Sequence, residues 1–228
     1  MREIVMDTET TGLNPFDGHK IVEIGCVELM NHVPTGKVYH QYINPKRDMP
    51  TEAFQVHGLS AERLSKEPVF AAVGDAFLEF IGDAKLVIHN ASFDMKFINA
   101  ELEWMGRKPI PFDRAVDTLA IARRRFPGSP ASLDALCRRF GIDNSSRELH
   151  GALLDSEILA DVYLELIGGR QPDFTLGSGP TGSTVTNTVS SGAAPQRPNK
   201  LPPRLTEAEK VAHEAFLDTM KDPVWRRT

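Results

Sequence analysis

The pattern of apolar and polar positions predicts that the chain begins with strands. Residues 4–6 form a short apolar run, and residues 21–30 and 37–43 alternate between apolar and polar side chains. Alternation with a period of two is typical of a strand with one buried face. Residues 31–36 are rich in turn-forming residues and are expected to be a hairpin loop. The start of the chain is therefore predicted to be an antiparallel meander of three strands.

Helical spacing becomes frequent after residue 50. Short helical turns are expected over residues 53–64, and residues 70–81 place Phe70, Phe77 and Ile81 on one apolar stripe. Strands then alternate with helices, which indicates an α/β domain with a mixed central sheet, the meander along one side and flanking helices. The remaining expected elements are short strands at residues 85–89 and 116–117 and helices at residues 93–105, 118–126, 132–140 and 151–167.

The composition changes sharply after Gly169. Residues 171–204 consist largely of Gly, Ser, Thr, Pro and Asn, which is typical of a disordered linker. Beyond it, Thr206 and Glu209 fit a capping box at the start of an amphipathic helix. A single helix cannot bury its own apolar face, so we expect it to fold against a partner, a disordered or back-docked tail being the alternative. The predicted organisation is a domain over residues 1–170, a flexible linker over residues 171–204, and a C-terminal helix and tail over residues 205–228.

Composition and charge narrow the class of protein. A chain of 228 residues with 41% hydrophobic and 25% charged residues is typical of a soluble globular protein. No run approaches the roughly 18 apolar residues of a membrane helix, and a signal peptide is not evident, so a cytoplasmic location is expected. The net charge of -5 argues against coating nucleic acid by bulk electrostatics, but not against gripping a chain end through bound metal. Cys26 and Cys137 are expected to be buried thiols.

Candidate chemistry begins at the end of the first strand. Asp7 and Glu9 lie two residues apart, which puts both carboxylates on one face of an extended chain. Thr10, Thr11 and Gly12 are expected to break the strand, so that both acids lie at its exposed end. Their mutual repulsion would be relieved by a hard divalent cation, magnesium or manganese. A pair of solvated acids is the alternative.

Two further positions carry acids next to expected helix starts. Asp94 opens a helix shortly after His89, where the helix dipole alone could explain a carboxylate. His150 lies at the start of the last long helix, five residues before Asp155. An ordinary histidine at a helix start is the alternative for His150.

These positions form three motifs whose residue types, spacing and order resemble those of a known family. Asp7-x-Glu9, His89-Asn90-x-x-Phe93-Asp94 and His150-x-Ala152-x-x-Asp155 resemble the DEDD superfamily of 3′→5′ exonucleases, and the His150 spacing resembles its histidine branch. Two segments, Asp7 to Asn14 and Val56-His57-Gly58, resemble one group within this superfamily, the epsilon subunits of bacterial DNA polymerase III. The resemblance implies a ribonuclease H-like fold and a proofreading 3′→5′ exonuclease that removes mispaired 3′-terminal deoxynucleotides as monophosphates.

The resemblance also implies a role for each motif residue. Asp7 would bridge two divalent metal ions, Mg²⁺ or Mn²⁺. Glu9 and Asp155 would complete the site that carries the attacking water, and Asp94 would help to hold the second ion. His150 would deprotonate the water, a task that suits an imidazole with a pKa near neutrality. Asp7, Glu9 and Asp155 would also face the substrate.

Other substrate contacts follow from the same resemblance. Thr10, Gly12 and Leu13 are expected beside the terminal nucleotide, with Leu13 as an apolar wedge against a base. Glu52 and His57 match positions that approach the same nucleotide, although capping of turns is the alternative for both.

Partners are implied by the rest of the chain. Residues 205–228 are expected to bind the DNA polymerase III alpha subunit, and the substrate is expected to be the single-stranded 3′ end of DNA. Gln171 to Leu176 loosely resembles the short peptides that dock on the sliding clamp. The arginines at residues 123–125 and 138–139 could touch phosphates or form a solvated helix face.

Two other functions remain compatible with the sequence. A stand-alone DEDD exoribonuclease would carry the same catalytic residues, but the linker and terminal helix would have no evident use. A non-catalytic structural subunit of a polymerase would not require the five motif residues, none of which is replaced.

Overall fold

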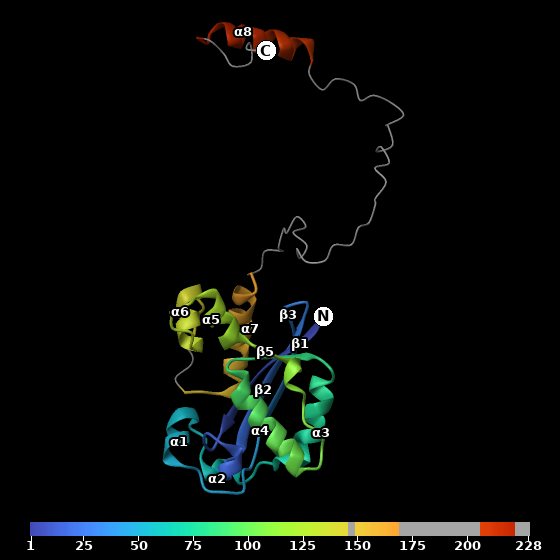
Figure 1. Cartoon of the computed structure of the whole chain (residues 1–228), viewed down its shortest axis with the longest axis vertical. Coiled ribbons are helices and arrows are strands. Elements are labelled where there is room, and N and C mark those ends of the chain that lie inside the picture. Colours follow the sequence, from blue (N-terminus) through green and yellow to red (C-terminus); the bar gives the residue numbers. More distant parts are fainter. Residues whose placement is uncertain (146–148, 169–205, 222–228) are drawn as a thin grey trace, which may run out of the picture. The chain divides into compact units, whose positions relative to one another are not determined.

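The computed structural model of the chain describes residues 1–145, 149–168 and 206–221 (Figure 1). These fall into two units, one within residues 1–175 and one within residues 176–228, and each is described by itself. The expected linker over residues 171–204 and the expected clamp-binding peptide from Gln171 to Leu176 lie outside the described residues.

A mixed five-stranded sheet with the order β3-β2-β1-β4-β5 forms the centre of the first unit. β1 pairs antiparallel with β2, and β2 pairs antiparallel with β3, which confirms the predicted meander. β4 runs parallel to β1, and β5 runs parallel to β4. The strands are β1 (Arg2–Thr10), β2 (Ile21–Met30), β3 (Val33–Tyr42), β4 (Lys85–Ile88) and β5 (Ala115–Asp117).

The hairpin between β2 and β3 is tighter than the predicted loop over residues 31–36. Asn31 and His32 alone make the turn, with φ angles of 50° and 66°. Two successive residues with positive φ form the kind of turn whose twist matches a hairpin, and asparagine tolerates this conformation well. Val33 therefore already pairs with Met30, and β3 begins four residues earlier than expected.

β1 also extends further than predicted. It continues through Thr10, which pairs with Ile21 of β2 after a local shift in register, so Asp7 and Glu9 lie within the strand. Glu9 is only 8% exposed, and the expectation that both acids lie at an exposed strand end is wrong. Pairing with β2 carries the strand past the point where local propensity predicts its end, since β4 pairs only with residues 3–5.

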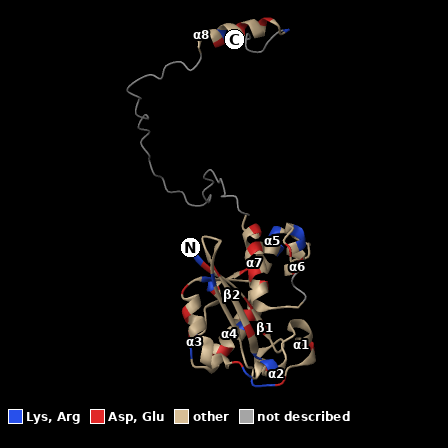
Figure 2. Cartoon of the chain, turned by 180° about the vertical axis from the view of Figure 1, so that it is seen from behind, with Lys and Arg blue, Asp and Glu red and all other residues tan. Residues whose placement is uncertain are grey.

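Helices cover both faces of the sheet (Figure 1). α4 begins two residues earlier than predicted, and the helices expected at residues 118–126, 132–140 and 151–167 are confirmed to within one residue at each end. Lys and Arg gather on α5 and α6, and Asp and Glu lie along the neighbouring α7 (Figure 2). The helices of this unit are η1 (Pro15–Asp17), α1 (Thr51–His57), α2 (Ala61–Leu64), α3 (Phe70–Ile81), α4 (Ala91–Trp104), η2 (Phe112–Arg114), α5 (Thr118–Arg125), α6 (Leu133–Phe140) and α7 (Ala152–Leu166).

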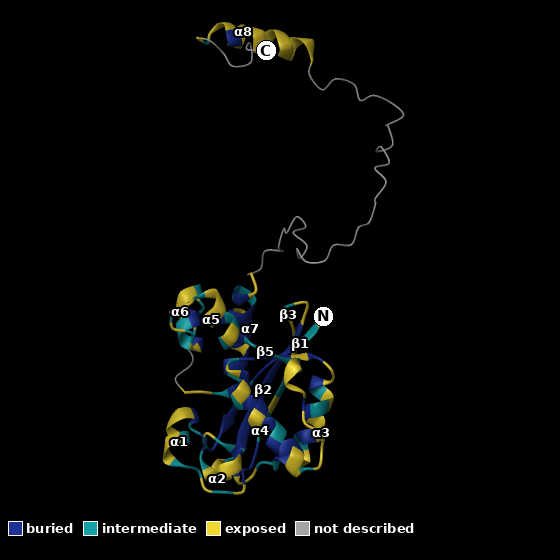
Figure 3. Cartoon of the chain, viewed as in Figure 1, coloured by how far each residue is buried: buried dark blue, intermediate teal, exposed yellow. Residues whose placement is uncertain are grey.

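The core lies in two layers, one on each face of the sheet (Figure 3). Ile4 and Met6 pack in one cluster with Phe77 of α3 and Phe97 of α4. Val5, between them, points to the other face and packs in a second cluster, which includes residues of α5, α6 and α7. β1 is therefore buried on both faces, which holds the polar residues at its carboxyl end in a rigid frame.

The two cysteines and the C-terminal helix are found as the sequence analysis predicts. Cys26 and Cys137 are buried free cysteines, as predicted. The second unit contains α8 (Glu207–Asp218), whose capping box between Thr206 and Glu209 is present as expected. In the described part of the chain, every helix is too short or too polar to cross a membrane.

Candidate active site

Two adjoining cavities lie at the carboxyl end of β1. The first, which we call the acidic cavity, has a volume of about 480 Å³. All five residues of the three motifs line it: Asp7, Glu9, Asp94, His150 and Asp155. These residues lie up to 148 positions apart in the sequence, and the fold brings them together around one cavity.

β1 supplies the first two acids, and its neighbour β2 makes room for the third. Asp7 is paired with Gly25 across the two strands. A Cβ atom at Gly25 would lie only 2.2 Å from the backbone of Ala152 and Leu153, so the glycine lets the first turn of α7 rest on the sheet. Ser156 holds the same contact, since its hydroxyl donates to the Gly25 carbonyl at 2.9 Å. This close approach brings Asp155, one turn into α7, to the cavity that Asp7 lines.

The tightest cluster of potential ligands combines β1 with the start of α7. Glu9, His150 and Asp155 each offer an atom, and these atoms all lie within 4.8 Å of one another. Glu9 and Asp155 are buried, whereas His150 is exposed, with its Nδ1 atom 3.3 Å from Asp155 Oδ2. Buried carboxylates that converge in this way need a positive charge nearby, because each disfavours ionisation of the other.

Asp94 reaches the acidic cavity from a helix rather than from the sheet. It lies in the first turn of α4 and is 2% exposed. Burial raises the pKa of Asp94 well above its usual range, while a hydrogen bond from the hydroxyl of Thr8 acts in the opposite direction. A buried acid of this kind is a good ligand for a cation, since a bound cation would offset the cost of ionising it.

The second cavity, which we call the turn cavity, has a volume of about 580 Å³ and lies beside the turn after β1. It shares Thr8, Glu9 and Phe93 with the acidic cavity. Leu13, which lines it, is 82% exposed and so presents an apolar side chain to solvent. All of the residues expected to contact the terminal nucleotide line it, namely Thr10, Gly12, Leu13, Glu52 and His57.

His57 lines this cavity with a buried side chain. It is buried, and its Nδ1 accepts a hydrogen bond from the Leu59 amide at 3.0 Å. In the neutral ring the proton must then be on Nε2. Among the described residues, Nε2 is buried without a well-formed hydrogen bond. Burial also lowers the pKa of His57, which keeps the ring neutral.

The arginine-rich segments divide between structure and site. Arg125 donates to the carbonyls of Glu165 and Leu166 at the end of α7, and Arg139 lies over the ring of Phe126. Arg123 instead lines the acidic cavity. The sequence offered both interpretations for these arginines, and only Arg123 reaches the cavity.

Thr8 and Asp134 also line the acidic cavity, and the sequence analysis did not single them out as site residues. Thr8 lies between two motif acids, so its side chain points to the opposite face of the strand. The sequence alone does not show that this face also contacts the site. Asp134 accepts a hydrogen bond from Asn144, on the segment that leads to His150.

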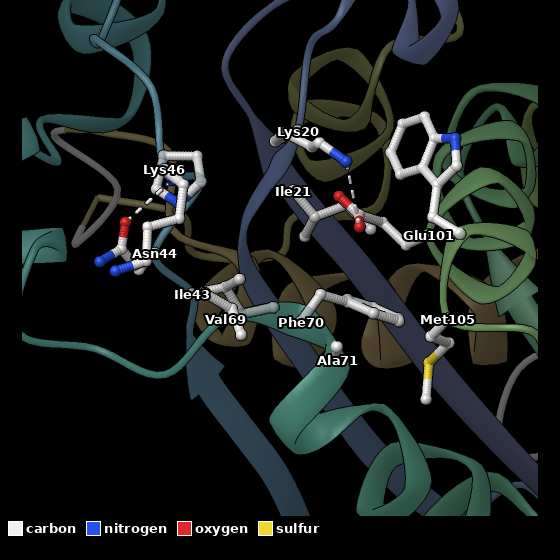
Figure 4. Close-up of a pocket in the computed structure, with 12 residues that line it drawn as sticks. Lys20, Ile21, Ile43, Asn44, Lys46, Val69, Phe70, Ala71, Glu101 and Met105 are labelled. Carbon is white, nitrogen blue, oxygen red and sulfur yellow. Dashed lines mark hydrogen bonds and ion pairs between the residues drawn. The ribbon is translucent and has the colours of Figure 1, made fainter.

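A third cavity, of about 230 Å³, contains none of the candidate site residues (Figure 4). Lys20 points toward Glu101, with its Nζ atom 3.5 Å from Glu101 Oε2 (Figure 4). The same Nζ atom lies over the Trp104 ring. Lys20 and Glu101 thus form an ion pair within this cavity.

Comparisons with known proteins agree in one family. The RNase_T family model, described as Exonuclease, matches residues 4–163. DNA polymerase III subunit epsilon of Rickettsia felis is 50% identical over 225 residues, which cover 96% of this chain and 97% of the relative. The subunit of the same description from Escherichia coli K12 is 44% identical, covering 96% of this chain and 93% of the relative.

Solved structures show the same fold. Exonuclease X in complex with a 5′-overhanging duplex DNA is 25% identical and has a TM-score of 0.57, covering 72% of this chain and 90% of its own. The nuclease domain of 3′hExo, a DEDDh family member bound to rAMP, has a TM-score of 0.62 at 20% identity, covering 73% and 91%. The predicted ribonuclease H-like sheet with flanking helices is thereby confirmed.

Proposed function

This chain belongs to the exonuclease family and, within it, to the epsilon subunits of DNA polymerase III, and we propose that the acidic cavity is its catalytic site. As an epsilon subunit, the chain is a proofreading 3′→5′ exonuclease. The proposal rests on one observation: Asp7, Glu9, Asp94, His150 and Asp155 all line a single cavity next to one that can receive a nucleotide.

The family depends on divalent metal ions, and the donor set of the acidic cavity fits them. Carboxylate oxygens are the ligands that Mg²⁺ and Mn²⁺ prefer. The convergence of Glu9, His150 and Asp155 within 4.8 Å and the burial of Asp94 both favour a bound cation. Two ions, Mg²⁺ or Mn²⁺, would be held by Asp7, Glu9, Asp94 and Asp155. Such ions would offset the negative charge of the phosphodiester and of the leaving 3′ oxygen.

His150 would act as the general base. Its side chain is exposed and lines the cavity, so water can reach it. Nδ1 faces Asp155 Oδ2 at 3.3 Å, so a proton on Nδ1 is stabilised there and Nε2 is left to accept a proton from water. The carboxylate also fixes the orientation of the ring.

The turn cavity would hold the 3′-terminal nucleotide. Leu13, exposed where it lines this cavity, is suited to pack against a base and to keep it unstacked. His57 would form part of the wall against the nucleotide, and Glu52 on the same helix can accept a hydrogen bond from a hydroxyl. Thr10 and Gly12 would contact the nucleotide through the turn itself.

The second unit would attach the exonuclease to its polymerase. On α8, the apolar side chains of Val211 and Phe216 are exposed, which is what a helix that docks in a groove requires. We assign residues 205–228 to binding of the alpha subunit, with residues 171–204 as the tether that raises the local concentration of the catalytic domain. Gln171 to Leu176 remains a hypothesis for a sliding-clamp contact, and the cytoplasm is the compartment in which such an assembly would act.

The proposal is tested with a 5′-labelled primer–template that carries a 3′ mismatch. The wild-type chain should shorten the primer stepwise with magnesium, should stop with a chelator, and should remove mispaired ends faster than paired ends. His150→Ala should lower the rate by at least about 100-fold, the usual effect of removing a general base. A fully active His150→Ala protein would overturn the assignment. A matched RNA substrate, expected to be a poor one, would separate this function from that of an exoribonuclease.

A further inference from the structure

The backbone of His150 is held from outside its own helix. Its amide donates a hydrogen bond of 3.0 Å to the carbonyl of Val56, near the end of α1. α7 begins only at Ala152, so His150 precedes the helix that carries Asp155. The position of the imidazole along the cavity therefore depends on a segment almost a hundred residues earlier in the chain.

A side-chain contact next to this hydrogen bond fixes the same junction. α1 ends at Gly58, whose φ is +70°. A Cβ atom added to Gly58 would lie 2.7 Å from Leu149 Cδ1, so Leu149 packs directly on the glycine backbone. Leu149 is nevertheless 51% exposed, and burying this side chain contributes only part of the usual stabilisation of a core leucine.

α1 is also one wall of the turn cavity. Glu52, Val56 and His57 line that cavity, and Val56 is the residue whose carbonyl accepts from His150. The helix that would contact the terminal nucleotide thus holds the backbone of the residue that would act on the water.

We propose that Leu149 and Gly58 are positioning residues that latch the His150 backbone onto α1, so that the general base is aligned by the element that receives the nucleotide. This inference rests on the proposed role of His150. Neither Leu149 nor Gly58 touches the reacting atoms in this arrangement, and both act through His150. The contact between Leu149 and Gly58 thus affects the alignment of the general base separately from the contacts that α1 makes with the nucleotide.

The test compares Leu149→Ala with wild type in the full chain, by kcat and KM on a single-stranded oligonucleotide. Misplacement of a catalytic group costs about 10- to 100-fold in rate, so kcat should fall by at least about 10-fold. KM should stay within about two-fold, because the nucleotide-facing residues are unchanged. Leu149→Met, which restores an apolar side chain of similar length, should recover most of kcat.

Val33→Ala serves as the matched control. Val33 is also a large, exposed apolar residue, and it begins β3 at the end of the sheet away from the acidic cavity. Its truncation should leave kcat unchanged. Wild-type kcat in Leu149→Ala would overturn the latch.

A second measurement, amide hydrogen exchange, tests the contact independently of enzymatic activity. The amide of His150 should exchange with solvent slowly in wild type and markedly faster in Leu149→Ala, because its bond to Val56 is then less often formed. Equal exchange in both proteins would overturn the proposal even if the variant were slow for another reason. His150→Ala in the same kinetic series separates the two proposals: if it is inactive while Leu149→Ala is normal, only the latch fails, and if it is active, the role of His150 itself fails.

Discussion

The hydroxyl of Thr8 donates a hydrogen bond of 2.6 Å to Oδ1 of Asp94, and this bond joins β1 to α4 in the buried centre of the site. Thr8 lies between Asp7 and Glu9, so the strand that supplies two acids to one face uses the intervening residue to hold a third from the other face. Because Asp94 is 2% exposed, water cannot readily replace the Thr8 hydroxyl as a donor.

Thr8→Val should therefore weaken metal binding. Valine has the same shape without the hydroxyl, and it leaves a buried carboxylate short of one donor, at a cost of about 1–3 kcal/mol. The magnesium concentration for half-maximal exonuclease rate should rise, and the free energy of unfolding without metal should fall. Thr8→Ser, which keeps the hydroxyl, should resemble wild type. Identical magnesium curves for Thr8→Val and wild type would contradict this role.

Much of the fold and of the candidate site follows from local patterns, because each motif residue lies at a predictable place in a strand or at a helix start. The spacing of Asp7 and Glu9 needs only an extended chain, and the position of Asp155 needs only one helical turn. What local patterns could not predict comes from long-range contacts. Pairing with β2 extended β1 to Thr10, and the two-residue turn at Asn31 and His32 lengthened β3.

The contact between Gly25 and α7 belongs to the same class of long-range feature. An isolated glycine in a strand pattern indicates only a close approach of something. The approaching element, the first turn of α7, is about 130 residues away in the sequence. Since this contact sets the distance between Asp7 and Asp155, it cannot be derived from either motif alone.

Gly25→Ala should for this reason reduce both activity and stability. The new methyl group would meet backbone atoms of Ala152 and Leu153 at 2.2 Å, which cannot move without shifting α7. Overpacking of this kind typically costs about 1–3 kcal/mol, and the accompanying shift of Asp155 should lower kcat. Thermal unfolding and primer digestion measure the two effects.

Gly74→Ala is the control for this glycine substitution. There the new methyl group meets Met105 Sδ at 2.6 Å, the far part of a flexible side chain, and α3 carries none of the proposed active-site residues. Activity should stay at the wild-type level. If Gly25→Ala behaved in the same way, the close packing of α7 would have no bearing on the site.

Arg123→Ala should impair turnover of DNA, whereas Arg124→Ala should not. Among the described residues that line the acidic cavity, Arg123 is the only Lys or Arg. A cavity with this many carboxylates repels a phosphodiester, and a guanidinium on its wall can offset that repulsion. A charge-assisted hydrogen bond contributes about 1.5–3 kcal/mol, so kcat/KM should fall by about 10- to 100-fold. Equal kcat/KM values for the two variants would indicate a solvated helix face instead.

The stability of the domain should decrease as the pH falls below the usual pKa of histidine, in part because of His57. Burial lowers the pKa of His57 in the folded chain, so the unfolded chain, with a pKa near 6.5, binds the proton first. Above about pH 6.5 both states are neutral and the full stability is present. Below it, the free energy of unfolding falls as the pH drops toward the lowered pKa of the folded state.

Urea unfolding at about pH 8 and about pH 5.5 measures this dependence. His57→Gln removes the titrating group, so its loss of stability between the two values should be smaller than that of wild type. The same slope in both proteins would mean that burial of His57 does not oppose its protonation.

Disruption of the apolar face of α8 should separate polymerase binding from exonuclease activity. Phe216 is 58% exposed on a capped helix, and aromatic side chains at the centre of an interface often contribute more than 2 kcal/mol to binding. Phe216→Asp should weaken binding to the polymerase alpha subunit by at least about 30-fold. It should leave digestion of a single-stranded oligonucleotide unchanged, because every proposed catalytic residue lies in the first unit.

Lys210→Gln, on the opposite side of the same helix, removes a charge outside the apolar face and should bind normally. Wild-type binding by Phe216→Asp would place the polymerase contact elsewhere in the chain, and loss of nuclease activity in that variant would show that α8 supports the catalytic domain as well.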